Sequence, residues 1–284
     1  MIGIIKNQIK TILLLGILSG ILLGVGQLVG GRQGLFIGLI FALIMNIGGY
    51  WFSDKIVLKI YRAKEVSKEH SPKLHKIVDE VCKKADIPKP RVYLLPTKHS
   101  NAFATGRNPK NSAVACTEGI IELLNEDELK GVIAHEVAHI KNRDILITTI
   151  AGVIASVISY IGFIARWGAI FGSDDDNRGG NILSIILLAV ITPLVATLLQ
   201  LAISRSREYF ADESGAKYTN EPESLAKALE KIDADAKVHP LKFGSPTTSS
   251  LFIANPFRGS GLLNLLSTHP AVSERTKRLR ALRL

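Results

Sequence analysis

The sequence predicts a mainly α-helical membrane protein, in which four transmembrane helices carry a cytoplasmic α+β domain with a small β-sheet. Two observations indicate this fold class. The 284 residues are 47% hydrophobic and only 21% charged, with a mean hydropathy of +0.23, which is too apolar for an ordinary soluble domain. Most of the charged residues are gathered in two blocks, at 54–144 and 205–284. Together these blocks contain enough chain for one folded domain.

Four runs without a charged residue each supply the roughly 20 residues that a helix needs to cross the hydrocarbon core of a membrane. The runs are 11–31, 33–53, 145–165 and 181–204. A cleaved signal peptide is the alternative for the first run. That run is longer than a usual signal core, however, and the second run follows directly after Arg32. We therefore expect four domains or segments: a transmembrane hairpin at 1–53, the first part of the cytoplasmic domain at 54–144, a second hairpin at 145–204 and the second part at 205–284.

Small residues and a proline mark the expected helix packing within the membrane. Gly16, Gly20 and Gly24 follow one another at a spacing of four, which predicts a small face for close helix packing. Pro193 is expected to kink the fourth run or to free a backbone carbonyl.

The basic residues near the ends of the runs predict the orientation, because Lys and Arg are enriched on the cytoplasmic side. One side carries Lys6, Lys10, Lys55, Lys59, Arg62, Arg143, Arg205 and Arg207. The other side carries Arg32, Arg166 and Arg178 beside the acidic run 174–176. We expect a multi-pass protein of the plasma membrane with both termini and both charged blocks in the cytoplasm. The net charge of +10 is then explained by this topology and by contact with the lipid bilayer, and no nucleic-acid partner is expected.

The two cysteines exclude two classes of stabilised fold. Cys82 and Cys116 are far apart in the sequence and neither belongs to a CxxC pair. A disulfide scaffold and a cysteine zinc cluster therefore cannot be built from them.

Local patterns in the first charged block predict a small sheet followed by a capped helix. Apolar residues at helical spacing predict a helix over 71–85. Strands are predicted at 91–95, 102–105 and 112–116, the last two around a turn at 106–109. Asn125 and Glu128 form a capping-box pattern, which predicts a helix that starts there and runs through His135 and His139 towards Asp144.

The capped helix carries the clearest chemical signal. His135-Glu136-Val137-Ala138-His139 places two imidazoles one turn apart on one helical face, where both can bind one zinc ion. Glu136 is then placed to reach a zinc-bound water. The alternative is that the pattern binds no metal and consists of two surface histidines beside an ordinary glutamate.

A catalytic zinc ion needs a third protein ligand and an open coordination position. The extended pattern with a third histidine fails, because Asn142 and Ile145 stand where it requires Gly and His. The next acids that the expected topology places on the same side of the membrane are Glu208, Asp212 and Glu213. Glu208 and Asp212 are one helical turn apart, so we expect Glu208 to ligate the ion while Asp212 holds the other ring nitrogen of a histidine. A solvated helix end with mixed charges is the alternative.

Four segments in this order carry a resemblance that covers essentially the whole chain. They are Asn101-Ala-Phe-Ala-Thr-Gly106, His135-Glu-Val-Ala-His-Ile-Lys-Asn142, Glu208-Tyr-Phe-Ala-Asp212, and Thr268-His269-Pro270 followed by Glu274-Arg275. Together they resemble the HtpX family of membrane-embedded zinc metalloproteases, which are related to the CAAX prenyl endopeptidases.

The resemblance implies a zincin-like catalytic domain that holds one Zn²⁺ and degrades damaged or misfolded membrane proteins. It implies that His135, His139 and Glu208 are ligands and that Glu136 is the catalytic base. His269 resembles a histidine that stabilises the oxyanion, although a histidine before a proline is also a common turn residue. Asp212, Asn142 and Arg275 are expected around the ligands, Arg275 as an internal ion-pair partner. The expected substrate-binding edge strand consists of Asn101, Ala102, Phe103 and Ala104.

Two other functions remain open at this point. A processing peptidase for lipidated peptides would use the same chemistry, but the related prenyl endopeptidases enclose their site in a larger cage of spans. A non-catalytic membrane scaffold with a structural zinc ion would require Glu136 to be dispensable. Three protein ligands leave a coordination position open, which favours a catalytic site.

Overall fold

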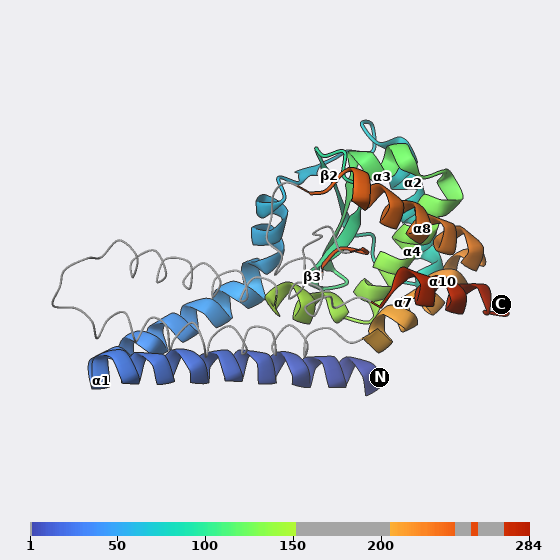
Figure 1. The fold of residues 1–284 in the computed structure, drawn as a ribbon. Helices are drawn as coiled ribbons and strands as arrows, with labels where there is room; N and C mark the ends of the chain where they lie inside the picture. Colours follow the sequence, from blue (N-terminus) through green and yellow to red (C-terminus); the bar gives the residue numbers. More distant parts are fainter. Residues whose placement is uncertain (1, 152–204, 242–250, 255–269) are drawn as a thin grey trace.

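The computed structural model describes residues 2–151, 205–241, 251–254 and 270–284, and it combines a long helical hairpin with a helix-rich domain around a small sheet (Figure 1). The described helices are α1 (Ile2–Ile60), α2 (Pro72–Ala85), α3 (Glu118–Leu123), α4 (Glu126–Lys141), α7 (Arg205–Thr219), α8 (Pro222–Val238) and α10 (Val272–Arg280). The strands are β1 (Lys64–Glu65), β2 (Arg91–Leu95), β3 (Ala102–Asn108) and β4 (Asn111–Thr117).

Helix α1 folds back on itself to form two antiparallel arms (Figure 1). The reversal coincides with Gly31, whose φ of +56° lies in the left-handed region that glycine adopts readily. The arms touch through backbone at Gly26 and Gly34, where a side chain on either residue would collide with the other arm. Asn46 also donates a hydrogen bond of 2.8 Å to Ser19 across the arms.

The glycine face expected within the first run is not where the arms meet. In the described part of the chain, no atom comes within 4 Å of a Cβ built at Gly16, Gly20 or Gly24. The close approach of the two described arms uses Gly26, Gly34 and Gly38 instead. The position of the reversal decides which glycines face the partner arm, and the spacing alone does not contain that information.

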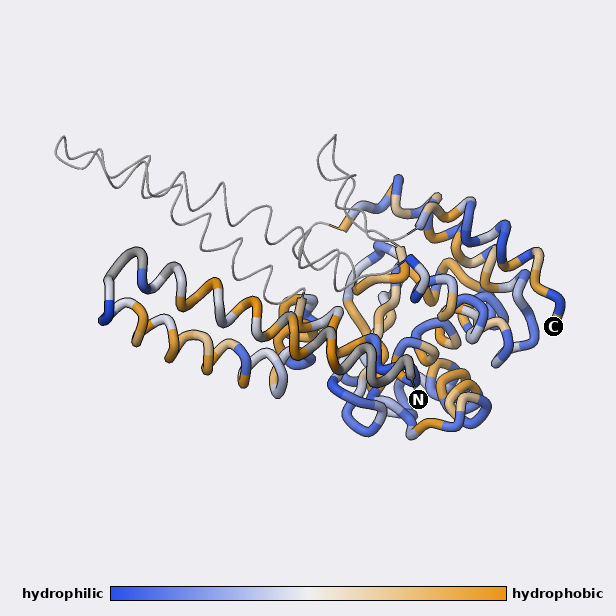
Figure 2. Tube along the Cα trace, turned by 90° about the horizontal axis from the view of Figure 1, so that it is seen from below, coloured by the Kyte–Doolittle hydropathy of each residue, from blue (hydrophilic) through white to orange (hydrophobic). Residues whose placement is uncertain are grey.

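One segment among the described residues, Gly31–Ile60, is long and apolar enough to cross a membrane, with a mean hydropathy of 1.9 in its most apolar stretch. Leu15–Gly24 on the other arm is a shorter apolar segment. Hydrophobic residues extend along both arms (Figure 2), and many of them are exposed, as Phe36 and Ile44 are. The predicted run 145–165 is described only as far as Ala151. The run 181–204, with Pro193, lies outside the described residues.

The sheet is mixed and has the strand order β1-β2-β4-β3, so β3 forms one edge. The short strand β2 pairs in parallel with β4, whereas the hairpin of β3 and β4 is antiparallel. The predicted strand 91–95 is confirmed, and the other two strands are confirmed but longer than expected. The residues expected to form the turn partly extend β3 through a register shift between Gly106 and Asn108, and strand β1 was not predicted.

Two hydrophobic clusters cover the two faces of the sheet. The larger one contains the apolar residues of α2, α4 and α8, including the five that the helical spacing identified: Leu74, Ile77, Val78, Val81 and Cys82. The smaller one joins the end of the α1 region to β3 through Tyr61 and Phe103. The sheet is therefore packed between the helical layer that carries α4 and the base of the hairpin.

Helix α4 begins at the predicted capping box. The Asn125 side chain accepts a 2.9 Å hydrogen bond from the Glu128 backbone N–H, and the Glu128 carboxylate accepts a 3.0 Å bond from the Asn125 N–H. The helix ends at Lys141, before the expected Asp144, because Arg143 adopts a positive φ of 58°. The cap fixes where α4 starts, and thereby which residues face the core.

We expect Asn125→Ala to destabilise the domain by about 1 kcal/mol, or roughly 2–4 °C in melting temperature, because the Glu128 backbone N–H loses its acceptor at the helix start. Thermal unfolding of the full chain in detergent measures the change. Glu122→Ala, at an exposed position just before the cap, is the control. Equal melting temperatures for the two variants would contradict this role of the cap.

Candidate metal centre and active site

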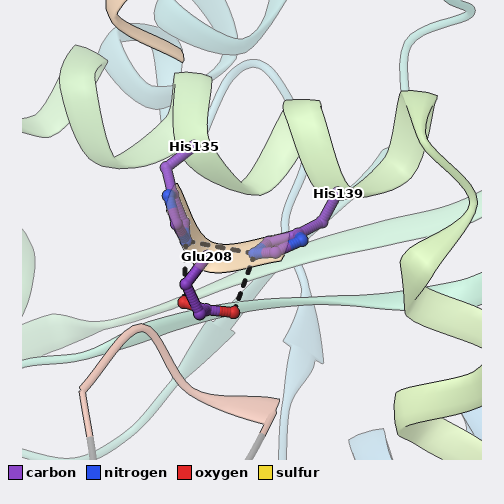
Figure 3. A group of neighbouring side chains, drawn as sticks. All are labelled: His135, His139 and Glu208. Carbon is purple, nitrogen blue, oxygen red and sulfur yellow. Dashed lines mark hydrogen bonds and ion pairs between the residues drawn. The ribbon is translucent and has the colours of Figure 1, made fainter. Parts of the chain in front are cut away.

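The two histidines of the HExxH pattern project from one face of α4 towards Glu208 of α7 (Figure 3). The Nε2 atoms of His135 and His139 are 3.1 Å apart. The Glu208 carboxylate oxygens lie 3.7 Å from His135 Nε2 and 3.5 Å from His139 Nε2. Residues separated by more than 60 positions in the sequence thus present three ligand atoms to one point.

The spacing of these three atoms fits zinc. Ligands about 2.0–2.1 Å from a tetrahedral zinc ion lie about 3.3 Å from one another, and the three observed distances are close to this value. Two imidazole nitrogens and one carboxylate are also a donor set of catalytic zinc sites, in which a fourth position is left for water. The residues present therefore fit the ion that the sequence pattern indicates.

Gly215 allows α7 to approach α4 closely enough to deliver Glu208. A Cβ at Gly215 would lie 2.9 Å from the backbone nitrogen of His135, so the two helices touch backbone to backbone beside a ligand. Glu208 and Asp212 project from α7 two turns and one turn before this contact. The glycine therefore sets the distance between the two ligand-bearing helices.

Asp212 and Arg275 form a buried charged pair beside His135. Asp212 Oδ1 lies 2.9 Å from His135 Nδ1, and Arg275 donates two hydrogen bonds of 2.7 and 2.9 Å to the Asp212 carboxylate. Burial alone would raise the pKa of Asp212, but the Arg275 charge and the hydrogen bonds lower it to about 2. The ionised carboxylate therefore faces Nδ1 of the imidazole, which leaves Nε2 directed at the ligand cluster.

A second carboxylate has the same relation to His139. Asp144 Oδ2 lies 3.2 Å from His139 Nδ1, on the side of the ring away from Glu208. The sequence pattern predicted Asp144 only as the end of the helix. Its position five residues after His139, just beyond the end of α4, is the signal that could have identified it as a partner of this histidine.

Glu136 is buried and lines the same cavity as the three ligand residues. Burial raises the pKa of Glu136 to about 8, against the charge of His139. Ala104, on the edge strand β3, lines the cavity with Glu136, and its backbone acts to lower the pKa of this carboxyl group. Glu136 is thereby held between the metal ligands and the strand that we expected to bind substrate.

The expected substrate strand does form an edge of the sheet, but three of its four residues already contact another segment of the chain. Ala102 O accepts a 3.1 Å hydrogen bond from Ile253 N, and Phe103 forms an antiparallel bridge with Phe252. Asn101 has a fully buried side chain that bonds the backbone of Ala254. No local pattern marks this segment, because the pairing of strands about 150 residues apart does not depend on neighbouring residues.

The structure places the remaining predicted residues as follows. Asn142 is the C-terminal cap residue of α4 and is not among the residues that line the cavity. His269 lies outside the described residues. Cys82 and Cys116 are buried, and burial raises the pKa of the Cys82 thiol to about 12, which fits two reduced core residues.

The site has the form of a zinc metallopeptidase centre: an HExxH helix, a glutamate ligand from a second helix, and an edge strand beside them. Comparison with known proteins supports this class of enzyme. Residues 68–283 match Peptidase family M48. A "Protease HtpX homolog" of Pyrococcus furiosus is 53% identical over 273 residues, which cover 96% of this chain and 94% of that protein. Another, from Syntrophobacter fumaroxidans, is 48% identical over 280 residues, covering 97% and 99%.

The chain belongs to peptidase family M48, and its relatives within that family are HtpX homologs. It is a zinc metallopeptidase and a membrane protein, with a His-His-Glu zinc site typical of the family. A crystal structure of Ste24p from S. mikatae has a TM-score of 0.49 and 19% identity, and the alignment covers 97% of this chain and 65% of that chain.

Gly215→Ala should lower zinc affinity by about tenfold, because the added Cβ pushes α7 away from His135 and carries Glu208 with it. A zinc titration against a fluorescent chelator measures the affinity. Ser214→Ala, on the same helix, adds no volume and is the matched control. An affinity unchanged by Gly215→Ala would show that the helix contact does not position the ligand.

Arg275→Met should cost about 3–5 kcal/mol of stability, because it leaves the Asp212 carboxylate buried without its cationic partner. Arg275→Lys keeps the charge but loses the two-pronged geometry, so an intermediate loss is expected. Thermal unfolding reports both, and Arg278→Met, at an exposed position on the same helix, is the control. A similar loss for Arg275→Met and Arg278→Met would refute the role of the buried pair.

Proposed function

We propose that this protein is a membrane-embedded zinc endopeptidase that hydrolyses peptide bonds of damaged or misfolded membrane proteins at the cytoplasmic face of the plasma membrane. The observation that carries the proposal is the meeting of His135, His139, Glu208 and Glu136 around one cavity beside an edge strand. Three ligands plus a buried carboxylate next to a peptide-binding edge are what hydrolysis of an extended peptide requires.

In this proposal His135, His139 and Glu208 hold the zinc ion, and the chain's other residues orient them. The bound ion supplies Lewis-acid polarisation of the scissile carbonyl and a water of lowered pKa. Asp212 and Asp144 hold the imidazoles of His135 and His139 through their Nδ1 atoms. Each ring is thereby fixed with Nε2 towards the Glu208 carboxylate, where these three residues would hold the ion.

Glu136 then acts as the general base and acid. Its carboxylate takes a proton from the attacking water and delivers it to the leaving amine. Glu136 lines the same cavity as Ala104 of β3, where an added substrate strand would place its scissile bond. His269 is the proposed donor to the oxyanion.

The proposed location follows from charge and from the apolar hairpin. The basic residues at the base of the hairpin, Lys55 and Lys59, belong to the cytoplasmic side under the positive-inside rule. In the described chain these residues lie at the end of α1 that leads into the sheet. A catalytic domain held there meets unfolded polypeptide that leaves the bilayer, which supports membrane proteins as the substrate class.

The test is a comparison of wild type with Glu136→Gln, both purified in detergent under chelator and then given zinc. Cleavage of casein and bound zinc are measured for each. We expect wild type to cleave only with zinc, and Glu136→Gln to hold one zinc ion while its cleavage rate falls by at least about a hundredfold. Glu122→Gln, on the surface, is the control. Equal zinc binding with no cleavage by wild type would favour the non-catalytic scaffold.

A further inference from the structure

Residues 251–254 lie against the outer edge of β3 in the manner of an added strand. Phe252 bridges Phe103 in antiparallel register, and the Ile253 N–H donates a 3.1 Å hydrogen bond to the Ala102 carbonyl. β4 occupies the other edge of β3. The segment therefore uses the strand edge at which an extended substrate would bind.

Two side chains of the site bind the backbone of this segment. The Asn101 amide donates a 2.8 Å hydrogen bond to the Ala254 carbonyl and accepts a 3.4 Å bond from the Ala254 N–H. Arg275 donates a 2.9 Å bond to the Ile253 carbonyl. These contacts involve only peptide groups of the bound segment, so any extended peptide can make them.

The Asn101 amide is itself held in one orientation. Its Nδ2 lies 3.2 Å from His99 Nε2, and its Oδ1 accepts a 3.0 Å bond from the Ala102 N–H. His99 Nδ1 lies 2.6 Å from the His239 carbonyl, to which it donates. The ring thus presents Nε2 as an acceptor, and the amide is fixed to offer one donor and one acceptor to a peptide unit. A pre-oriented amide of this kind recognises backbone and is suited to a strand of any sequence.

The segment also fills the space above the metal ligands. Leu251, Phe252 and Ile253 line the cavity that contains His135, Glu136, His139 and Glu208. Leu251 and Ile253 flank Phe252, which bridges the edge strand, so the segment borders the metal ligands and the strand edge together. A second strand cannot pair with Ala102 and Phe103 while the segment is in place.

We propose that residues 251–254 are an internal substrate mimic, which occupies the peptide-binding edge of β3 and must be displaced before cleavage. The proposal rests on the proposed function, because it assigns the same edge to the substrate. It identifies Ala102 O, the Asn101 amide and Arg275 as the groups that bind a peptide backbone. It also predicts that an apolar peptide of the sequence Leu-Phe-Ile-Ala binds to the same groups in trans.

The first arm of the test removes one hydrogen bond from the segment. Ile253→Pro lacks the N–H that bonds Ala102 but leaves the Ala102 carbonyl available to a substrate. Since one hydrogen bond shifts an equilibrium about three- to tenfold, kcat/KM for a fluorogenic peptide should rise by that factor. Ile253→Val keeps the N–H and should change kcat/KM much less. Zinc content and melting temperature establish that both variants are folded.

The second arm measures binding without turnover, in full-length protein that carries Glu136→Gln. A fluorescein-labelled acetyl-Leu-Phe-Ile-Ala peptide with two C-terminal lysines is titrated and followed by fluorescence polarisation. It should bind about three- to tenfold more tightly when Ile253→Pro is added. The same peptide with an N-methyl group on isoleucine is the matched control and should bind more weakly, because it cannot donate to Ala102.

The outcomes separate this inference from the proposed function. If wild type cleaves, but Ile253→Pro is no more active and the N-methyl peptide binds as well as its parent, the inference is overturned and the peptidase stands. If no variant cleaves while the parent peptide binds more tightly after Ile253→Pro, the mimic is supported and the proposed function fails. If the segment has only a structural role, the Ile253→Pro variant should lose zinc or activity. The parent and N-methyl peptides should then bind equally well, which would overturn the inference.

Discussion

The buried pair of Arg275 and Asp212 is the interaction on which the rest of the active site depends. It joins α10 to α7 across 63 positions of sequence, and Asp212 in turn holds His135 on α4. A guanidinium and a carboxylate are costly to bury, so they persist only with nearly complete hydrogen bonding. Here Nε and Nη2 of Arg275 bond Asp212, while Nη1 bonds the Ile253 carbonyl. One side chain therefore couples the orientation of a zinc ligand to the segment that lies along the edge of β3.

The features that local sequence predicted are those with local physical causes. The capping box at Asn125, the strand 91–95 and the pair of histidines one turn apart each depend on residues within a few positions of one another. Glu208 was predicted as a ligand from the charge distribution and the expected topology, because few acidic residues are expected on the same side of the membrane as the HExxH helix. The contacts that sequence did not predict are long-range: the pairing of Phe252 with Phe103, and the choice of Gly26 and Gly34 as the place where the arms touch. The spacing of residues within one segment contains no information about these contacts, because each contact depends on a second, distant segment.

The metal centre also depends on close packing between helices. Gly215 against the backbone of His135 and Gly131 against Leu225 bring α7 and α8 onto α4 without an intervening side chain. A glycine in a helix interior costs about 1 kcal/mol relative to alanine. In a helix that must deliver a ligand atom to within a few tenths of an ångström, the close approach offsets this cost. Gly215 thus lowers the intrinsic helix stability of α7 but allows this helix to bring Glu208 to the metal site.

An aromatic cluster links the membrane hairpin to the occupied edge of β3. Tyr61, directly after α1, has its ring centroid 4.8 Å from that of Phe252 and 5.8 Å from that of Phe103, and the two phenylalanine rings are 5.1 Å apart. All three side chains are buried. If residues 251–254 leave the edge, Phe252 leaves with them, and the Tyr61 and Phe103 rings become an exposed apolar surface beside the end of a membrane-length helix. Such a surface favours extended apolar chain over folded, polar protein, because burial against it stabilises the complex in proportion to the apolar area covered. Displacement of the segment would therefore open the active site and, in the same step, expose the apolar surface that the proposed substrates, unfolded membrane segments, would cover.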